Sequence, residues 1–233
     1  MSGLSPIRNR SLFVKLLLSM TAIVVITVLL ISSVTYTISA DTSIQNSIDY
    51  NQSILEQQRE LIHKEMNAIQ NIASSMIMTQ SYLYHTINGK LSVGSLIDLS
   101  RYLDEQQKLS PYIDSIYLAY GKLDLVLTSR SDTKMSTLSA FADRSWIPEM
   151  DKATGSRTTW LTGRPNGFAN EDGLTTSLMQ KFPLIGPVSG AIVINLKLDA
   201  LFGDYLGHYR NKKGTTLVLG PQGERLYGEQ DEA

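Results

Sequence analysis

The pattern of apolar positions divides the chain into an uncharged N-terminal stretch and a longer region of mixed polarity. Residues 16–40 contain no charged side chain and are rich in Leu, Ile and Val. An α-helix rises about 1.5 Å per residue and the hydrocarbon core of a bilayer is about 30 Å thick, so roughly 20 apolar residues cross it. The stretch therefore predicts a transmembrane helix over residues 16–40.

The charges on either side of this stretch predict its orientation. Three basic residues and no acidic residue precede it, and Asp41 follows it. Because basic residues stay on the cytoplasmic side, we expect residues 1–15 to form a cytoplasmic tail and the later chain to lie outside the cell membrane. A cleaved signal peptide is the alternative. Its apolar region would be shorter, about 7–15 residues, and Ile38 stands where a small residue is expected.

A long helix is expected to follow the membrane segment, over residues 41–86. No Pro or Gly occurs between Asp41 and Asn88, where Asn88-Gly89 forms a helix stop signal. Apolar residues recur along it at seven-residue steps, namely Ile48, Leu55, Ile62, Ile69 and Met76. Such a stripe can pack on the chain's own domain or against a second copy of the chain. We expect packing in the distal half and a homodimer through the juxtamembrane half.

The hydrophobic period changes from helical to alternating after residue 110. A second helix is predicted over residues 92–109, because Leu96, Leu99 and Leu103 share one face. Strands are then predicted at residues 112–120, 123–128, 157–161, 174–182, 190–198, 215–219 and 225–227, with a short helix at 200–206. Gly121-Lys122 suits a tight type II′ turn between the first two strands, and residues 162–172 are rich in turn formers.

This order of elements predicts the fold class. Two helices followed by mostly hairpin-connected strands indicate an α+β fold, with an antiparallel sheet spanning residues 112–198. The transmembrane helix would continue into the long helix, which would cover one face of that sheet.

Composition narrows the function classes. The 233 residues are 42% hydrophobic, which excludes a disordered chain, and the net charge of −1 gives no electrostatic basis for binding nucleic acid. There is no Cys, and the three His residues are not spaced as metal ligands. No nucleophile motif or phosphate-binding glycine loop is present. We therefore expect no catalytic residue, no metal, no cofactor and no nucleic-acid partner, and the chain is not predicted to be an enzyme.

One short segment is a candidate for ligand binding. Arg144 and Trp146 lie two residues apart, so in extended geometry both would face one side of the chain. An Arg offers a planar fork for a carboxylate and a Trp offers a flat apolar wall. Alternatively, Trp146 fills the core and Arg144 pairs with Asp143 or Glu149. Tyr117 points to the face opposite Tyr112 and Tyr120 and is a further candidate for lining a pocket.

Taken together, several segments resemble a known family. They are YIDSIYLAY at residues 112–120, DRSW at 143–146, QKFPL at 180–184 and GPVSGAIVINLKLDALF at 186–202. Behind an N-terminal anchor and a long helix, this order is similar to the extracytoplasmic Cache sensor domains of bacterial receptors, which contain PAS-like sheets. It most resembles the versions attached to AraC-type transcriptional regulators and to sensor histidine kinases of two-component systems.

The resemblance implies a double Cache region. Residues 41–207 would be the sensor domain, and residues 208–233 would begin a second, incomplete Cache-like unit, so the chain would be truncated before its output module. Some members bind amino acids through an Arg-x-Trp-Tyr signature. Arg144 and Trp146 match it, and Glu149 occupies its acidic position, whereas Ser139 and Ile147 replace its aromatic residues. The ligand residues so implied are Arg144, Trp146 and Glu149, to which we add Tyr117.

The function expected is therefore sensory. The chain would be the extracytoplasmic input region of a single-pass bacterial signal-transduction receptor that controls transcription and responds to a small-molecule ligand or a partner. Two alternatives remain: a ligandless membrane-anchored dimerisation or interaction module, and an anchored surface hydrolase.

Overall fold

The chain divides into two compact units, Met1–Gln57 and Gln58–Ala233. The computed structural model describes residues 7–79, 93–152, 156–168, 174–184, 186–206, 217–220, 223 and 225–227. A single helix, α1 (Ile7–Thr79), contributes to both units.

The first unit consists of the N-terminal part of α1. Among the described residues, α1 is the one helix long and apolar enough to cross a membrane. The hydroxyls of Ser19, Thr21 and Thr27 donate to backbone carbonyls one turn earlier, at 2.8–2.9 Å, so these polar groups are satisfied within the helix. The apolar stretch and the long helix are thus continuous, as predicted. The helix is described as far as Thr79, and residues 80–86 lie outside the described residues.

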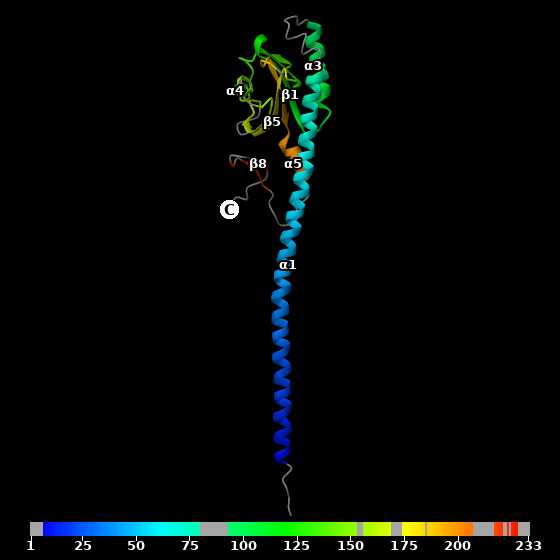
Figure 1. The fold of residues 1–233 in the computed structure, drawn as a ribbon, viewed down its shortest axis with the longest axis vertical. Coiled ribbons are helices and arrows are strands. Elements are labelled where there is room, and N and C mark those ends of the chain that lie inside the picture. The colour runs from blue at the N-terminus through cyan, green and yellow to red at the C-terminus, as the bar shows by residue number, and fades with distance from the viewer. Residues whose placement is uncertain are drawn as a thin grey trace, which may run out of the picture. The chain divides into compact units, whose positions relative to one another are not determined.

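The second unit contains a six-stranded sheet in the order β3-β2-β1-β6-β5-β4, with every neighbouring pair antiparallel. Figure 1 labels two of its strands, β1 and β5. Its strands are β1 (Ile113–Tyr120), β2 (Leu125–Thr128), β3 (Met135–Ser136), β4 (Thr158–Pro165), β5 (Leu174–Phe182) and β6 (Gly190–Leu196). A separate two-stranded sheet pairs β7 (Val218–Leu219) with β8 (Arg225–Tyr227). The α+β class and the antiparallel sheet are confirmed.

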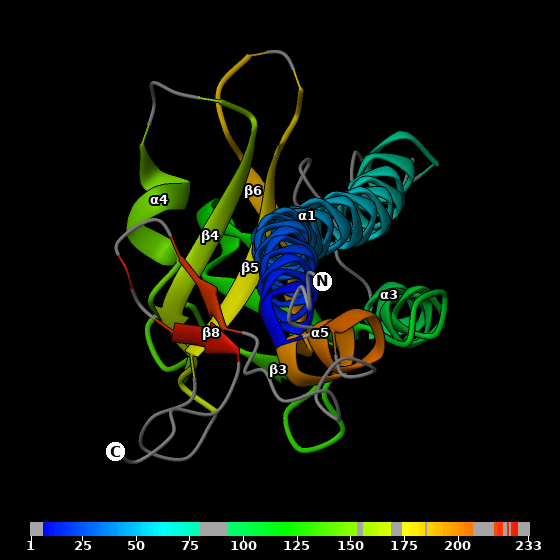
Figure 2. The same ribbon diagram turned by 90° about the horizontal axis from the view of Figure 1, so that it is seen from below.

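Helices cover one face of the six-stranded sheet. α1 from Gln58 onward lies there with α3 (Val93–Gln107) and α5 (Leu198–Leu206), whereas α4 (Ile147–Asp151) lies on the opposite side (Figure 2). The main core between helices and sheet includes buried Ile69, Ala73, Met76, Leu99, Leu103, Ile116, Leu118, Tyr120, Leu178 and Ile194. The distal half of the heptad stripe therefore packs on its own domain, as predicted, whereas Ile48 and Leu55 are exposed.

The connection after β1 differs from the prediction. Gly121-Lys122 does not form a type II′ turn, because Gly121 lacks the positive φ which that turn requires. Instead, Gly121–Leu123 forms a single 3₁₀ turn, η1, and Asp124 closes it in the left-handed region at φ 47°. The Asp124 amide donates to the Gly121 carbonyl at 3.3 Å. Asp is among the residues that tolerate this conformation.

Strand β4 is longer than predicted and runs through part of the expected turn region. Its register with β5 shifts between Leu161 and Arg164, so that Leu161 pairs with Ser177 and Arg164 with Thr175. Gly163 lies in this irregularity at φ 61°. Gly163 is therefore a bulge residue inside a strand and does not end it. β6 ends at Leu196, two residues before its predicted end, and α5 starts at Leu198.

Candidate ligand-binding site

The sheet face opposite the helices carries a second, smaller core. Because side chains alternate along a strand, β1 directs Tyr117 to this face while Ile116 and Leu118 point to the helices. Met179 of β5 and Val193 of β6 lie on the same face. These three buried side chains form the floor of the candidate site.

Three further aromatic rings pack with Tyr117 on this face, and we refer to Tyr117, Phe141, Trp146 and Phe168 as the aromatic cluster. The Tyr117 and Phe141 ring centroids are 4.9 Å apart in an edge-to-face arrangement, and those of Phe141 and Phe168 are 5.3 Å apart. Trp146 lies 6.3 Å from Tyr117 and 6.4 Å from Phe141. The rings come from β1, from the segment between β3 and α4, and from the segment after β4, so the cluster joins three distant parts of the chain.

A buried polar network borders the aromatic cluster, centred on Arg164. Its Nη1 donates to Asp143 Oδ1 at 2.6 Å and to Ser145 Oγ at 2.7 Å. Its Nε donates to Ser177 Oγ at 2.9 Å, and its Nη2 donates to Asn195 Oδ1 at 2.5 Å. All the guanidinium nitrogens are thus engaged. The bulge in β4 makes this possible, because regular alternation from Leu161 would direct Arg164 to the other face.

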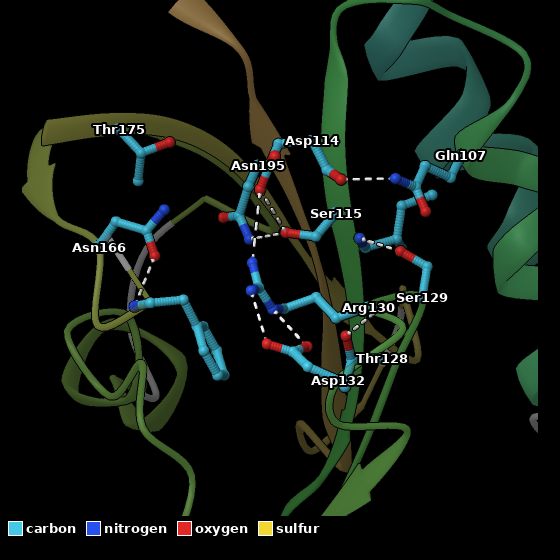
Figure 3. Close-up of polar contacts among 12 residues, drawn as sticks. Gln107, Asp114, Ser115, Thr128, Ser129, Arg130, Asp132, Asn166, Thr175 and Asn195 are labelled. Carbon is cyan, nitrogen blue, oxygen red and sulfur yellow. Dashed lines mark hydrogen bonds and ion pairs between the residues drawn. The ribbon is translucent and has the colours of Figure 1, made fainter. Parts of the chain in front are cut away.

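The network continues across the sheet. Asn195 Nδ2 donates to Ser115 Oγ at 2.9 Å, which links β6 to β1 (Figure 3). Ser177 Oγ also donates to Asn195 Oδ1, at 2.6 Å. Arg164, Asp143, Ser177, Asn195 and Ser115 are all buried, so these bonds form away from solvent and fix the positions of their side chains.

A second arginine lies at the outer side of the aromatic cluster. The Arg130 guanidinium stacks over the Phe168 ring, with its central carbon 4.1 Å from the ring centroid. Its Nε and Nη2 donate to the two carboxylate oxygens of Asp132, at 3.0 and 2.8 Å, and Asp114 lies 4.0 Å away (Figure 3). The hydrogen bonds from Arg130 lower the pKa of the Asp132 carboxyl. Arg130 is therefore held in place over Phe168.

Within the described part of the chain, three buried polar atoms at this site make no hydrogen bond, namely the Tyr117 hydroxyl, Trp146 Nε1 and Asp143 Oδ2, although the Ser115 side chain is close enough to Tyr117 to act on its pKa. Burial raises the pKa of Tyr117, so its hydroxyl stays protonated and can donate. The indole N–H is a donor only, and a carboxylate oxygen is an acceptor. The site therefore offers two donors and one acceptor beside an apolar surface.

The structure brings together two of the four residues predicted to bind ligand. Tyr117 and Trp146 are both in the aromatic cluster. Arg144 is exposed, and Glu149 is partly buried and pairs with Lys152. The extended geometry that would place Arg144 and Trp146 on one side is not formed, because the chain turns here, with the Ile147 amide donating to the Arg144 carbonyl at 3.1 Å. Arg144 is exposed whereas Trp146 is fully buried. The alternative pairing of Arg144 with Asp143 is also not formed, since Asp143 pairs with Arg164.

The sequence reasoning missed Arg164, Arg130 and Phe168. Arg164 stands in a stretch of turn-forming residues, and nothing local marks it as buried. Asn195 could have indicated the buried polar network from the sequence, because a polar residue within an apolar strand needs a buried hydrogen-bond partner. In the described residues, no group of three His, Asp or Glu side chains could hold a metal ion.

Comparison with known proteins adds a fold relationship. No protein-family model and no curated protein matches the sequence. Among solved structures, the chain resembles the sensory domain of the Campylobacter jejuni chemoreceptor Tlp3. The form with isoleucine bound gives a TM-score of 0.55 at 11% identity, covering 80% of this chain and 73% of that chain. The domain described without a named ligand gives 0.56 at 12%, covering 80% and 74%, and the complex with L-valine gives 0.53 at 10%, covering 80% and 73%. This chain therefore has the fold of a receptor sensory domain.

Proposed function

We propose that this chain is the membrane-anchored sensory input region of a bacterial transmembrane receptor, and that its ligand binds at the aromatic cluster. The observation that carries the proposal is that the Tyr117 hydroxyl, Trp146 Nε1 and Asp143 Oδ2 are all buried without a hydrogen bond and belong to the aromatic cluster and the polar network that borders it. A buried polar group without a partner costs about 1–3 kcal/mol. Three such groups at one site are accounted for by a bound molecule that supplies the missing partners.

The same three atoms define the chemistry of the ligand. Asp143 Oδ2 would accept from an ammonium or another donor, and Trp146 Nε1 and the Tyr117 hydroxyl would donate to a carboxylate or carbonyl. The rings of Phe141 and Phe168 would pack against an apolar body. A small aliphatic amino acid has all of these parts, and structures of the Tlp3 sensory domain have isoleucine or L-valine bound. Arg144 and Glu149, outside the cluster, would contact only a ligand that extends toward solvent.

The route from ligand to membrane would be α1. Ile69, Ala73 and Met76 of this helix are buried against the sheet, and the same helix contains the apolar stretch. We propose that the apolar stretch spans the cell membrane with the N-terminus in the cytoplasm, and that a ligand-dependent change at the sheet acts on α1. The output would be an AraC-type or histidine-kinase module, and the chain itself would act without catalysis.

Substitution of Tyr117 by Phe is expected to weaken ligand binding without destabilising the free protein. The change deletes one buried hydroxyl that makes no hydrogen bond to the described residues. The melting temperature without ligand should therefore be equal to or above that of the wild type, whereas affinity for the ligand should fall about 5–20-fold. The measurement is a thermal-shift and tryptophan-fluorescence titration of the full chain in detergent with a panel of L-amino acids.

Tyr102→Phe on α3 is the matched control, since Tyr102 is half-buried in the helical core, away from the cluster. It should leave affinity unchanged. If no amino acid shifts the melting temperature or the fluorescence, amino-acid sensing is wrong. Equal affinity in the Tyr117→Phe variant would instead place the ligand elsewhere.

A homodimer through the juxtamembrane part of α1 is a second element of the proposal. Ile48 and Leu55 are 52% and 58% exposed, although they continue the stripe that is buried farther along the helix. Because the chain has no Cys, single variants Ile48→Cys and Leu55→Cys can be tested by oxidative cross-linking in membranes. Both should form disulfide-linked dimers. Gln57→Cys, on the opposite side of the helix from Ile48, should cross-link much less, and equal cross-linking of all three would contradict the specific seam.

A further inference from the structure

A cavity of about 470 Å³ lies at one end of the sheet, away from the polar network around Arg164. It is found where β1 ends and where β4 and β6 begin. Its walls are Gly121 and Lys122 of η1, Met150 and Asp151 of α4, Arg157 before β4, and Gly186–Gly190, which lead into β6 and include its first residue. Four separate segments of the chain therefore converge on it.

The side chains at this cavity are mainly basic. Lys122 and Arg157 line it, and Asp151 is the acidic residue among the lining side chains. Behind it, Lys181 of β5 is buried, and its Nζ donates to the Lys152 carbonyl at 2.9 Å. A backbone carbonyl does not neutralise an ammonium charge. The positive charge around the cavity thus exceeds the negative charge.

Arg157 is only partly satisfied. Its Nη2 donates to the Gly186 carbonyl, whereas its Nη1 is buried and has no hydrogen-bond partner. A guanidinium presents its donors as a planar fork that matches two oxygens of a carboxylate or phosphate. Arg157 Nη2 is therefore bound by the β5–β6 loop, and Arg157 Nη1 remains available to donate to another group.

The backbone around the cavity requires glycine at two of its lining positions. Gly186 has φ 95°, a conformation that other residues rarely adopt. A Cβ at Gly190 would lie 2.1 Å from the Ala119 carbonyl oxygen and 2.4 Å from the Phe182 ring. The loop that accepts the hydrogen bond from Arg157 is thus held in a specific shape.

We propose that this cavity is a binding site for an oxyanion group, a carboxylate or a phosphate carried by a small solute. Arg157 Nη1 would donate to one oxygen of the anion, and Lys122 would add a second positive charge. The site is separate from the aromatic cluster in its polar residues, although Met150 contacts both. Binding of an anion in this cavity does not depend on which ligand binds at the aromatic cluster.

The test is calorimetric titration of the full chain in detergent with inorganic phosphate and, separately, with acetate. Saturable binding of either anion is expected, and the stronger of the two identifies the group preferred. Arg157→Gln should weaken that binding at least tenfold, and Arg157→Lys should weaken it less because it keeps the charge without the fork. Lys122→Gln should weaken it about threefold. Arg101→Gln, outside both the cavity and the aromatic cluster, should bind the anion as the wild type does.

Lys122 is exposed, so the Lys122→Gln variant is expected to fold. If Arg157→Gln does not fold, the anion affinity of Lys122→Gln tests the proposal instead. Two results would overturn the proposal. One is the absence of saturable binding of both anions by the folded wild type. The other is unchanged affinity in a folded Arg157→Gln variant, or in Lys122→Gln where the first variant does not fold.

Discussion

Replacing Arg164 by Met is expected to lower the free energy of unfolding by about 3–5 kcal/mol. The side chains of Arg164 and Asp143 are 7% and 0% exposed, and their charged atoms are 2.6 Å apart. Removing the guanidinium leaves a carboxylate buried without a countercharge and also removes the donors to Ser177 and Asn195. Urea unfolding of the full chain in detergent, followed by the fluorescence of Trp146 and Trp160, measures the change.

Arg101→Met is the matched control. Arg101 also faces an aspartate, Asp98, but the two side chains are 68% and 59% exposed and 3.6 Å apart. Solvent screens such a pair, so its loss should change stability by no more than about 0.5 kcal/mol. The double variant Arg164→Met, Asp143→Leu should recover at least half of the loss, because no charge then remains buried. A loss of under 1 kcal/mol for Arg164→Met would contradict the role given to the network.

The helices and most strands could be predicted because their apolar residues recur at helical or alternating spacing, which places them all on the buried face of the element. α3 places Leu99 and Leu103 in the core at helical spacing, and β5 begins and ends where predicted, at Leu174 and Phe182. The connections were harder. The turn after β1 depends on Asp124 adopting a left-handed conformation, and Gly121 alone suggested a different turn.

The candidate site was predicted only in part, for a physical reason. Tyr117 lies in the part of β1 that pairs regularly with β6, from Ser115 to Tyr120, so alternation predicts its face. Arg164 reaches the same face through a bulge, and Gly163, which forms it, is equally typical of a turn that ends a strand. Phe168 and Arg130 meet through a contact between segments 38 residues apart in sequence. Such long-range contacts leave no periodic pattern in the sequence.

Gly190→Ala is expected to destabilise the fold by about 3 kcal/mol, at the upper end for overpacking. Gly190 is the first residue of β6 and pairs with both Tyr120 and Phe182, so its neighbours on either side belong to the sheet. The added Cβ would lie 2.1 Å from the Ala119 carbonyl oxygen, a backbone atom that no rotamer change can move. Either β1 and β6 separate at this end or β6 shifts, and each costs ladder hydrogen bonds. The same urea unfolding measures the loss.

Gly121→Ala, at the same end of the sheet, separates this steric effect from the general effect of removing a glycine. A Cβ at Gly121 would meet only the Ser189 carbonyl oxygen at 3.7 Å and the Met150 methyl carbon at 3.9 Å, both ordinary contact distances. Its φ is not positive, so alanine adopts the backbone conformation without strain. Stability should therefore change by no more than about 1 kcal/mol, because the added methyl meets no close atom and alanine restricts only the unfolded chain. Equal losses for the two variants would show that close packing of β1 against β6 at Gly190 does not limit stability at this end of the sheet.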